Sequence, residues 1–221
     1  MGKNKLKRFA ENATFPHVFQ PTMAYPQPDH PLKGRWRSDF FKNSHPITLE
    51  LGCGRAEYTV ALSSLFPERN HIGVDWKGAR LWRGAKNTME RGQTNAAFLR
   101  ILISSIEAFF GKSDGVDEIW ITFPDPQPRD SREHKRLTSP EFLERYRTFA
   151  APGCKIHLKT DSTLMYEYTL QVIAEQGLNI EAQTNDLYAS PLADEVRSIQ
   201  TTYEKIWLAK GAKINYVRFL L

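Results

Sequence analysis

The sequence predicts an α/β fold in which a doubly wound, mainly parallel sheet is preceded by a basic, proline-rich arm. From residue 46 onward, short apolar runs alternate with stretches of helical periodicity, as β-α-β units require. A glycine-rich turn follows the first apolar run, and a proline-rich loop follows the fourth. A chain of 221 residues is long enough for one sizeable core and short for two.

Residues 1–45 form the predicted arm. They lack periodicity and contain prolines at 16, 21, 26, 28 and 31, so we expect an extended segment with at most one short helix at its start. Their surplus of cations over acidic residues accounts for the whole net charge of +5. Cations interleaved with aromatic side chains indicate a polyanionic partner, although a solvated tail can have the same composition.

The domain is predicted from residue 46 to residue 221. Its strands are expected at 47–51, 71–75, 96–101, 118–123, 154–159, 179–183 and 215–221. Its helices are expected at 57–65, 78–90, 105–110, 139–150 and 163–176. The last two strands are separated by a long polar stretch, residues 184–213, which does not have the pattern of a compact crossover helix.

The turn Gly52-Cys53-Gly54 ends the first strand and opens the first helix. Its glycines allow a tight turn and a close approach to a ligand, which both dinucleotide-binding and methyl-donor-binding folds use. Glu57 stands where a dinucleotide fingerprint has its third glycine. Glu50, before the turn, would repel a pyrophosphate but bind an ammonium. The pattern therefore favours S-adenosylmethionine, which has an amino group and a sulfonium but no phosphate.

Asp75 ends the predicted second strand, at the position where a carboxylate can accept hydrogen bonds from the two hydroxyls of a ribose. The alternative is that Asp75 only caps the helix expected from residue 78. The glycine turn and Glu50 favour ribose binding.

The loop after the fourth strand holds a single carboxylate, Asp125, among three prolines. Proline fixes φ and excludes a helix at the preceding residue, so we expect a rigid loop at the carboxyl edge of the sheet, where open α/β sheets bind ligands. The next eight residues, 129–136, contain four cations and a histidine, which a merely structural turn would not need. Thr138 is then expected to cap the helix at 139–150.

Four motifs of this sequence resemble those of the bacterial tRNA (guanine-N7-)-methyltransferases, the TrmB family. They stand in the order of that family and are highly specific together: Phe123-Pro124-Asp125-Pro126, Lys135-Arg136-Leu137-Thr138, Leu158-Lys159-Thr160-Asp161 and Thr201-Thr202-Tyr203-Glu204. The segment Gly34-Arg35-Trp36 before the domain is also similar. The resemblance implies a Rossmann-like class I methyltransferase fold, with a seven-stranded sheet whose last strand is antiparallel.

The resemblance further implies methyl transfer from S-adenosylmethionine to N7 of a guanine in the variable loop of tRNA, with Asp125 as the catalytic residue. The residues that it assigns to the cofactor are Glu50, Gly52, Gly54, Asp75, Leu102 and Asp125. Those that it assigns to the substrate are Arg129, Asp161, Thr201, Thr202, Tyr203 and Glu204. Arg132, Lys135 and Arg136 are the candidates for RNA phosphate contacts.

The sequence departs from the family pattern at two places: Gln127 replaces a tryptophan in the proline loop, and Leu102 replaces an aspartate near the adenine. Arg129 stands where the family usually has a substrate-contacting lysine. A row of cations in the second helix also leaves two interpretations open, since it can contact RNA phosphates or form a solvated face: Lys77, Arg80, Arg83 and Lys86.

No metal is expected, because Cys53 and Cys154 form no CxxC pair and no cluster of histidine, cysteine and carboxylate is present. No apolar run is long enough to cross a bilayer, and the basic N-terminus leads into no signal core. We therefore expect a cytoplasmic protein with tRNA as its partner, as a monomer or homodimer.

Two other functions are compatible with parts of the pattern. An NAD-dependent dehydrogenase would use the same turn, but the missing third glycine and Glu50 argue against it. A non-catalytic tRNA-binding protein with a retained methyl-donor fold would tolerate loss of the donor residues, yet Glu50, Gly52, Gly54 and Asp75 are all present.

Overall fold

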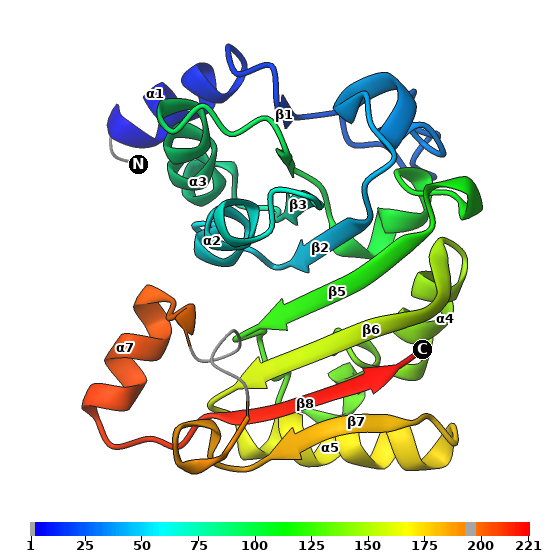
Figure 1. The fold of residues 1–221 in the computed structure, drawn as a ribbon, viewed down its shortest axis with the longest axis vertical. Coiled ribbons are helices and arrows are strands. Elements are labelled where there is room, and N and C mark those ends of the chain that lie inside the picture. Colours follow the sequence, from blue (N-terminus) through cyan, green and yellow to red (C-terminus); the bar gives the residue numbers. More distant parts are fainter. Residues whose placement is uncertain (1–2, 193–197) are drawn as a thin grey trace.

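An eight-stranded, mainly parallel sheet lies at the centre of the computed structural model, which describes residues 3–192 and 198–221 (Figure 1). The strands are β1 (Val18–Phe19), β2 (Ile47–Leu51), β3 (Asn70–Val74), β4 (Ala96–Leu99), β5 (Val116–Thr122), β6 (Ala150–Thr160), β7 (Ile180–Thr184) and β8 (Asn215–Leu220). Their order in the sheet is β1-β4-β3-β2-β5-β6-β8-β7. Strand β8 pairs antiparallel with β6 and β7, whereas the other pairings are parallel, which confirms the predicted fold and its antiparallel last strand.

The predicted count of seven strands is wrong by one, because β1 adds an eighth. This strand pairs Val18 with Phe98 and Phe19 with Leu99 at the edge of the sheet. A segment of two residues is too short to show the alternation of apolar and polar residues by which a strand is recognised in a sequence. Strand β1 is therefore recognisable only from its pairing with β4.

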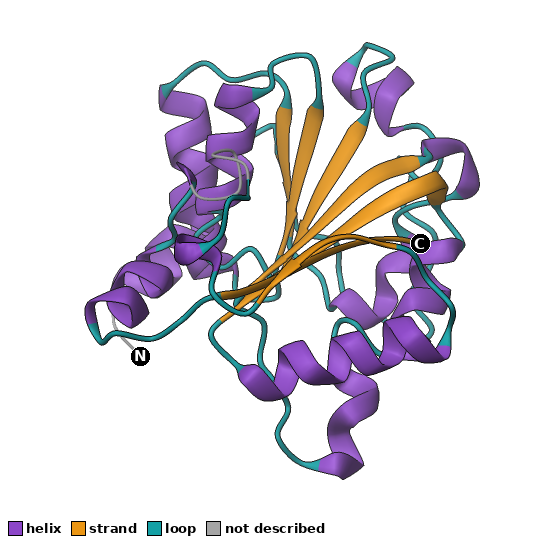
Figure 2. Ribbon diagram, turned by 60° about the horizontal axis from the view of Figure 1, so that its bottom comes forward, coloured by secondary structure: helices purple, strands orange, loops and turns teal. Residues whose placement is uncertain are grey.

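Helices cover both faces of the sheet (Figure 2). They are α1 (Lys3–Asn12), α2 (Glu57–Leu65), α3 (Gly78–Glu90), α4 (Pro140–Arg147), α5 (Thr163–Glu175) and α7 (Thr202–Ala209). Shorter helical turns are η1 (Trp36–Phe41), η2 (Ile103–Ala108), η3 (Lys112–Asp114), η4 (Asp130–Lys135) and η5 (Leu187–Ala189). The helix expected at 105–110 is thus the 3₁₀ turn η2, and the helix expected at 139–150 is the shorter α4.

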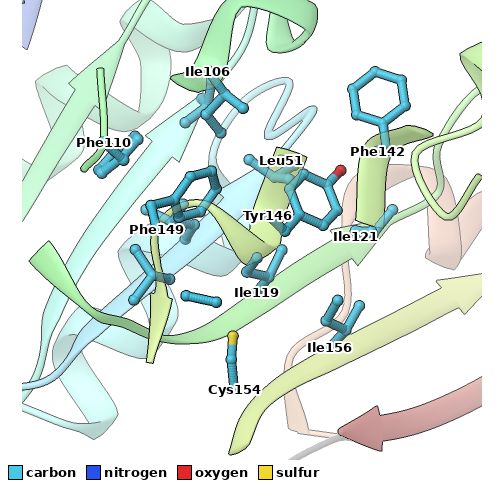
Figure 3. Packing of buried hydrophobic residues seen from close by; sticks show 14 of the residues in the cluster. Leu51, Ile106, Phe110, Ile119, Ile121, Phe142, Tyr146, Phe149, Cys154 and Ile156 are labelled. Atoms are coloured by element: carbon cyan, nitrogen blue, oxygen red, sulfur yellow. The ribbon is translucent and has the colours of Figure 1, made fainter. Parts of the chain in front are cut away.

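The larger core lies between the sheet and helices α4 and α5. Leu51, Ile119 and Ile121 project from β2 and β5 toward Tyr146 and Phe149 (Figure 3). The other face carries α2 and α3, and every residue of β2, β3 and β4 is buried. Strands buried on both faces are typical of parallel sheets, and they fix the direction in which the connecting loops leave the sheet.

The N-terminal segment begins with α1, the short helix that the sequence predicted at its start, but the rest of the segment is not a simple extended arm. It also contains the paired strand β1 and the π-helical turn η1. Trp36 is fully buried and donates from Nε1 to the carbonyl of Phe109 at 2.9 Å. The backbone amides of Gly34 and Trp36 donate to the carboxylate of Asp114. The aromatic side chains thus dock the segment on the domain, while the prolines only separate its short elements.

Candidate active site

The glycine turn between β2 and α2 has a backbone that requires its glycines. Gly52 and Gly54 have φ values of +75° and +55°. These values lie in the left-handed region that favours glycine. The amides of Gly52 and Cys53 donate to the carbonyl of Val74, which ties the turn to the end of β3. Cys53 is buried, and burial raises the pKa of its thiol, as expected for a filler and not for a nucleophile.

Asp75 directly follows β3, and its carboxylate contacts the backbone of two segments, the glycine turn and the residue before α3. Its Oδ2 accepts a hydrogen bond from the amide of Gly54 at 2.8 Å, and its Oδ1 accepts one from the amide of Lys77 at 2.6 Å. Lys77 is the N-cap residue of α3, and no side chain among the residues that the structure describes caps this helix, so Asp75 does not have the alternative role of a helix cap. Its contacts instead fix the backbone between β3 and α3. A carboxylate oxygen can accept more than one hydrogen bond, and Asp75 also lines a cavity, so these contacts are compatible with ribose binding.

A cavity of about 590 Å³ opens beside the glycine turn. Its lining is formed by Gly52, Asp75, Trp76, Ile101, Leu102, Ile103, Ser104, His134, Lys135, Glu141, Phe142 and Arg145. Walls that combine apolar side chains with the carboxylates of Asp75 and Glu141 suit a nucleoside, whose base is apolar on its faces and whose ribose presents hydroxyls. His134 and Lys135 lie in this wall, although the sequence analysis gave His134 no role and assigned Lys135 to phosphate.

We expect Asp75→Ala to weaken the binding of S-adenosylmethionine by about 1–3 kcal/mol, because a charged hydrogen-bond acceptor is removed from the cavity. Titration calorimetry measures this affinity. Asp29→Ala removes an exposed carboxylate from a surface ion pair and serves as the control. An unchanged donor affinity in folded Asp75→Ala would exclude Asp75 from the donor site.

Glu50 is almost completely buried beneath the glycine turn. Its Oε2 accepts hydrogen bonds from the amide and the hydroxyl of Thr59, at 2.8 and 2.5 Å, and its Oε1 accepts one from the hydroxyl of Thr122 at 3.3 Å. The carboxylate therefore joins the end of β2 to α2 and β5. The predicted contact of Glu50 with a donor ammonium stays a prediction, since Glu50 is not among the residues that line the cavity.

Burial raises the pKa of Glu50 to about 7, above its ordinary value of 4.5. A protonated Glu50 thus stabilises the fold fully below pH 4.5, and this contribution is lost as the pH rises toward 7. Glu50→Gln keeps the shape but does not titrate. We expect the stability of Glu50→Gln relative to wild type to rise by about 3 kcal/mol between pH 4.5 and pH 8. Urea unfolding of both proteins across this range measures it, and parallel profiles would show that Glu50 keeps an ordinary pKa.

The proline loop after β5 has a strained backbone. Phe123 and Gln127 have φ values of +50° and +45°, which are uncommon outside glycine. Such conformations persist only where the surroundings impose them, and they concentrate at functional sites. The amide of Phe123 donates to the carbonyl of Lys159 at 2.8 Å. Between the two strained residues, Asp125 is exposed and its Oδ1 accepts a hydrogen bond from the amide of Gln127 at 3.0 Å.

Arg136 is buried against this loop and binds its backbone, which corrects the assignment of Arg136 as a phosphate contact. The side chain is 4 % exposed, and its guanidinium donates to the carbonyls of Pro126 and Gln127, each at 3.1 Å. It also stacks over the ring of Tyr168 at 4.2 Å. A buried guanidinium with these partners is a positioning residue for the loop. Arg129, Arg132 and Lys135 are exposed, as phosphate contacts require.

Thr138 does not cap α4, because Ser139 does. The hydroxyl of Ser139 accepts from the amide of Phe142, while the hydroxyl of Thr138 pairs with that of Thr169 at 2.7 Å. The proline loop and the cations that follow it are thus fixed to both α4 and α5.

The motif Thr201-Thr202-Tyr203-Glu204 opens helix α7 and is mainly buried. Thr201 and Glu204 form a capping box, and Glu204 pairs with Lys159 at 2.7 Å, both side chains being fully buried. Thr202 donates from its amide and its hydroxyl to Glu57, the first residue of α2. Only Tyr203 is exposed. The motif therefore fixes the C-terminal segment to β6 and α2, and Tyr203 is its member that is open to a ligand.

The predicted residues meet at one edge of the sheet. The glycine turn follows β2, Asp75 follows β3, the loop with Asp125 follows β5, and Asp161 follows β6. All four strands are parallel, so these segments lie at the same carboxyl edge (Figure 1). Lys159 belongs to a motif that the sequence revealed, but its burial against Glu204 is visible only in the structure.

Among the residues that the structure describes, no group of three or more histidine, cysteine, aspartate or glutamate residues is arranged to hold a metal ion. Within the same residues, no helix has the length and apolarity that crossing a membrane requires.

The fold and the site together define a class I methyltransferase that depends on S-adenosylmethionine. A family model described as "Putative methyltransferase" matches residues 44–217. The solved structure of the 16S rRNA methyltransferase KamB has the same fold, with a TM-score of 0.65 and 14% identity over 88% of this chain and 95% of that chain.

Sequence comparison then defines the particular family. A tRNA (guanine-N(7)-)-methyltransferase of Bacteroides fragilis is 51% identical over 100% of this chain and 87% of its own. One of Cytophaga hutchinsonii is 46% identical over 99% of this chain and 98% of its own. The chain belongs to the tRNA (guanine-N7-)-methyltransferase family.

Proposed function

We propose that this chain transfers the methyl group of S-adenosylmethionine to N7 of a guanine in the variable loop of tRNA. The proposal is carried by one observation: a cavity that fits a nucleoside and a strained loop that presents a carboxylate lie at the same carboxyl edge of the sheet. Full-length relatives named for this activity support it.

The donor fits the residues that are present. Asp75 would bind the ribose, Trp76 and Leu102 would contact the adenine, and the glycine turn would admit the backbone close to the methionine part. Leu102 replaces the aspartate expected from the family, so side-chain recognition of adenine at this position is replaced by apolar contact. When bound, the donor supplies a methyl group that its positive sulfur has already activated.

Guanine N7 has a free lone pair in the plane of the ring and needs no deprotonation before attack. Catalysis then rests on alignment and electrostatics. Asp125 and Asp161 are the carboxylates that would accept hydrogen bonds from N1–H and the 2-amino group, and their negative charge favours the purine cation that methylation forms. The strain at Phe123 and Gln127 supports this role, because it holds Asp125 in one orientation.

The RNA backbone would be held by exposed residues that follow the catalytic loop. Arg129, Arg132 and Lys135 lie in or beside η4 without being buried. Phosphate contacts position the RNA, while the accessible base is recognised in the site. Tyr203 is the remaining exposed member of the C-terminal motif.

The test is a methylation assay on unmodified tRNA, followed by mapping of the modified base. N7-methylguanosine in the variable loop supports the proposal. Methylation of another atom or another nucleic acid would overturn it. Binding of tRNA without any methyl transfer would favour a non-catalytic binding protein, and thermal stabilisation by NAD but not by S-adenosylmethionine would favour a dehydrogenase.

A further inference from the structure

Four arginines from three separate segments converge on a second hollow, about 250 Å³ in volume, beside the active site. Arg8 comes from α1, Arg55 from the glycine turn, and Arg80 and Arg83 from α3. Tyr203 and Ala79 complete the lining, to which the residues that the structure describes contribute no carboxylate. Bringing four positive charges together costs free energy unless an anion lies between them.

The arginines of this hollow lack acidic partners, in contrast to their neighbour. Lys86, one turn further along α3, forms an ion pair with Glu11 at 2.9 Å. Within residues 3–192 and 198–221, none of the four arginines forms an ion pair. The structure thus divides the cations of α3: Lys86 is neutralised within the protein, and Arg80 and Arg83 are left for an external anion.

Contacts within the protein fix the positions of two of these arginines and of the helices that carry them. Arg8 and Arg83 both stack on the ring of Trp82, with centroid distances of 4.7 and 4.9 Å. The indole of Trp82 donates to Glu11, and Asn12 donates to the carbonyl of Gly78 at 2.9 Å, so α1 is fixed against α3. Stacking on an aromatic ring orients a guanidinium while leaving its N–H donors available.

We propose that this hollow binds a backbone phosphate of the RNA that carries the target guanine. The planar donor fork of arginine matches phosphate oxygens, and the exposed ring of Tyr203 provides a stacking surface for an adjoining base. Arg55 follows Gly54 directly, so the hollow adjoins the glycine turn. The RNA would then be held by this hollow in addition to the cations that follow the catalytic loop. This inference rests on the proposed function, since it takes tRNA as the substrate.

The experiment compares tRNA binding by wild type, Arg80→Ala/Arg83→Ala and a control, Arg35→Ala/Arg147→Ala, which removes equal charge from two surface ion pairs outside the hollow. We expect the Kd of the first variant for tRNA to rise about tenfold or more. The slope of log K against log salt should fall by about 1, because one fewer phosphate is neutralised. The control should match wild type, and donor affinity measured by calorimetry shows that each variant is folded.

Three outcomes separate the possible failures. An unchanged Kd and salt slope in Arg80→Ala/Arg83→Ala overturns this inference while leaving the methylation activity untouched. Inorganic phosphate that binds wild type but not the variant, without displacing tRNA, would assign the hollow to a small phosphate compound and also overturn it. Absence of N7 methylation of tRNA by wild type would instead refute the proposed function.

Discussion

Replacing Asp125 by Asn should lower kcat on the order of a hundredfold or more. Asn keeps the size of the side chain and the oxygen that accepts from the amide of Gln127, so the loop retains its geometry. What is lost is the negative charge that stabilises the developing purine cation. Because this interaction is strongest in the transition state, the loss should appear in kcat and much less in KM for tRNA.

Single-turnover methylation at saturating donor measures this effect. Asp130→Asn makes the same chemical change at an exposed position five residues further on and should leave the rate near that of wild type. A wild-type rate in Asp125→Asn would refute the assignment and make Asp161 the better candidate.

The second large effect is expected at the buried ion pair between Lys159 and Glu204. Lys159→Met should lower the free energy of unfolding by about 3–5 kcal/mol, because the carboxylate of Glu204 remains buried without its cation. Burial lowers the pKa of Lys159, and the carboxylate of Glu204 opposes that shift. Denaturant unfolding measures the loss, and replacing both partners by apolar residues, as in Lys159→Met/Glu204→Leu, should recover part of it.

Lys155→Met is the matched control. Lys155 lies on the same strand and pairs with Glu181 at 3.5 Å, but its side chain is 46% exposed. An exposed pair of this kind contributes at most about 1 kcal/mol. If Lys159→Met costs no more than Lys155→Met, the pair between β6 and α7 is open to solvent and does not hold the C-terminal segment in place.

The order of the elements and the edge that carries the site were predictable from local patterns. The bounds of β2, α2 and α3 were predicted to the residue, because apolar periodicity and the glycine turn mark them. The loop around Asp125 was recognisable because its prolines restrict the backbone whatever surrounds them. Short or partner-dependent elements were missed, as the strand β1 and the turn η1 show.

Assignments that depended on exposure were less predictable. Arg136 and Arg132 have the same charge and lie four residues apart, yet one is buried behind the loop and the other is exposed. Glu204 looked like a substrate ligand in its motif but is enclosed with Lys159. The charge and spacing of residues in a sequence do not predict the hydrogen-bond or ion-pair partner of a side chain, because that partner lies on another helix or strand.

The sequence by itself determined the alternating fold, the glycine turn, the rigid aspartate loop and the family, because each depends on residues that are close together in the chain. Only the tertiary structure decided which cations remain open to RNA and which are used inside the protein. It buried Arg136, paired Lys86 with Glu11, and gathered Arg8, Arg55 and Arg83 around one hollow. The physical reason is that the free energy of a charge depends on its burial and its neighbours, and folding brings those neighbours from distant positions.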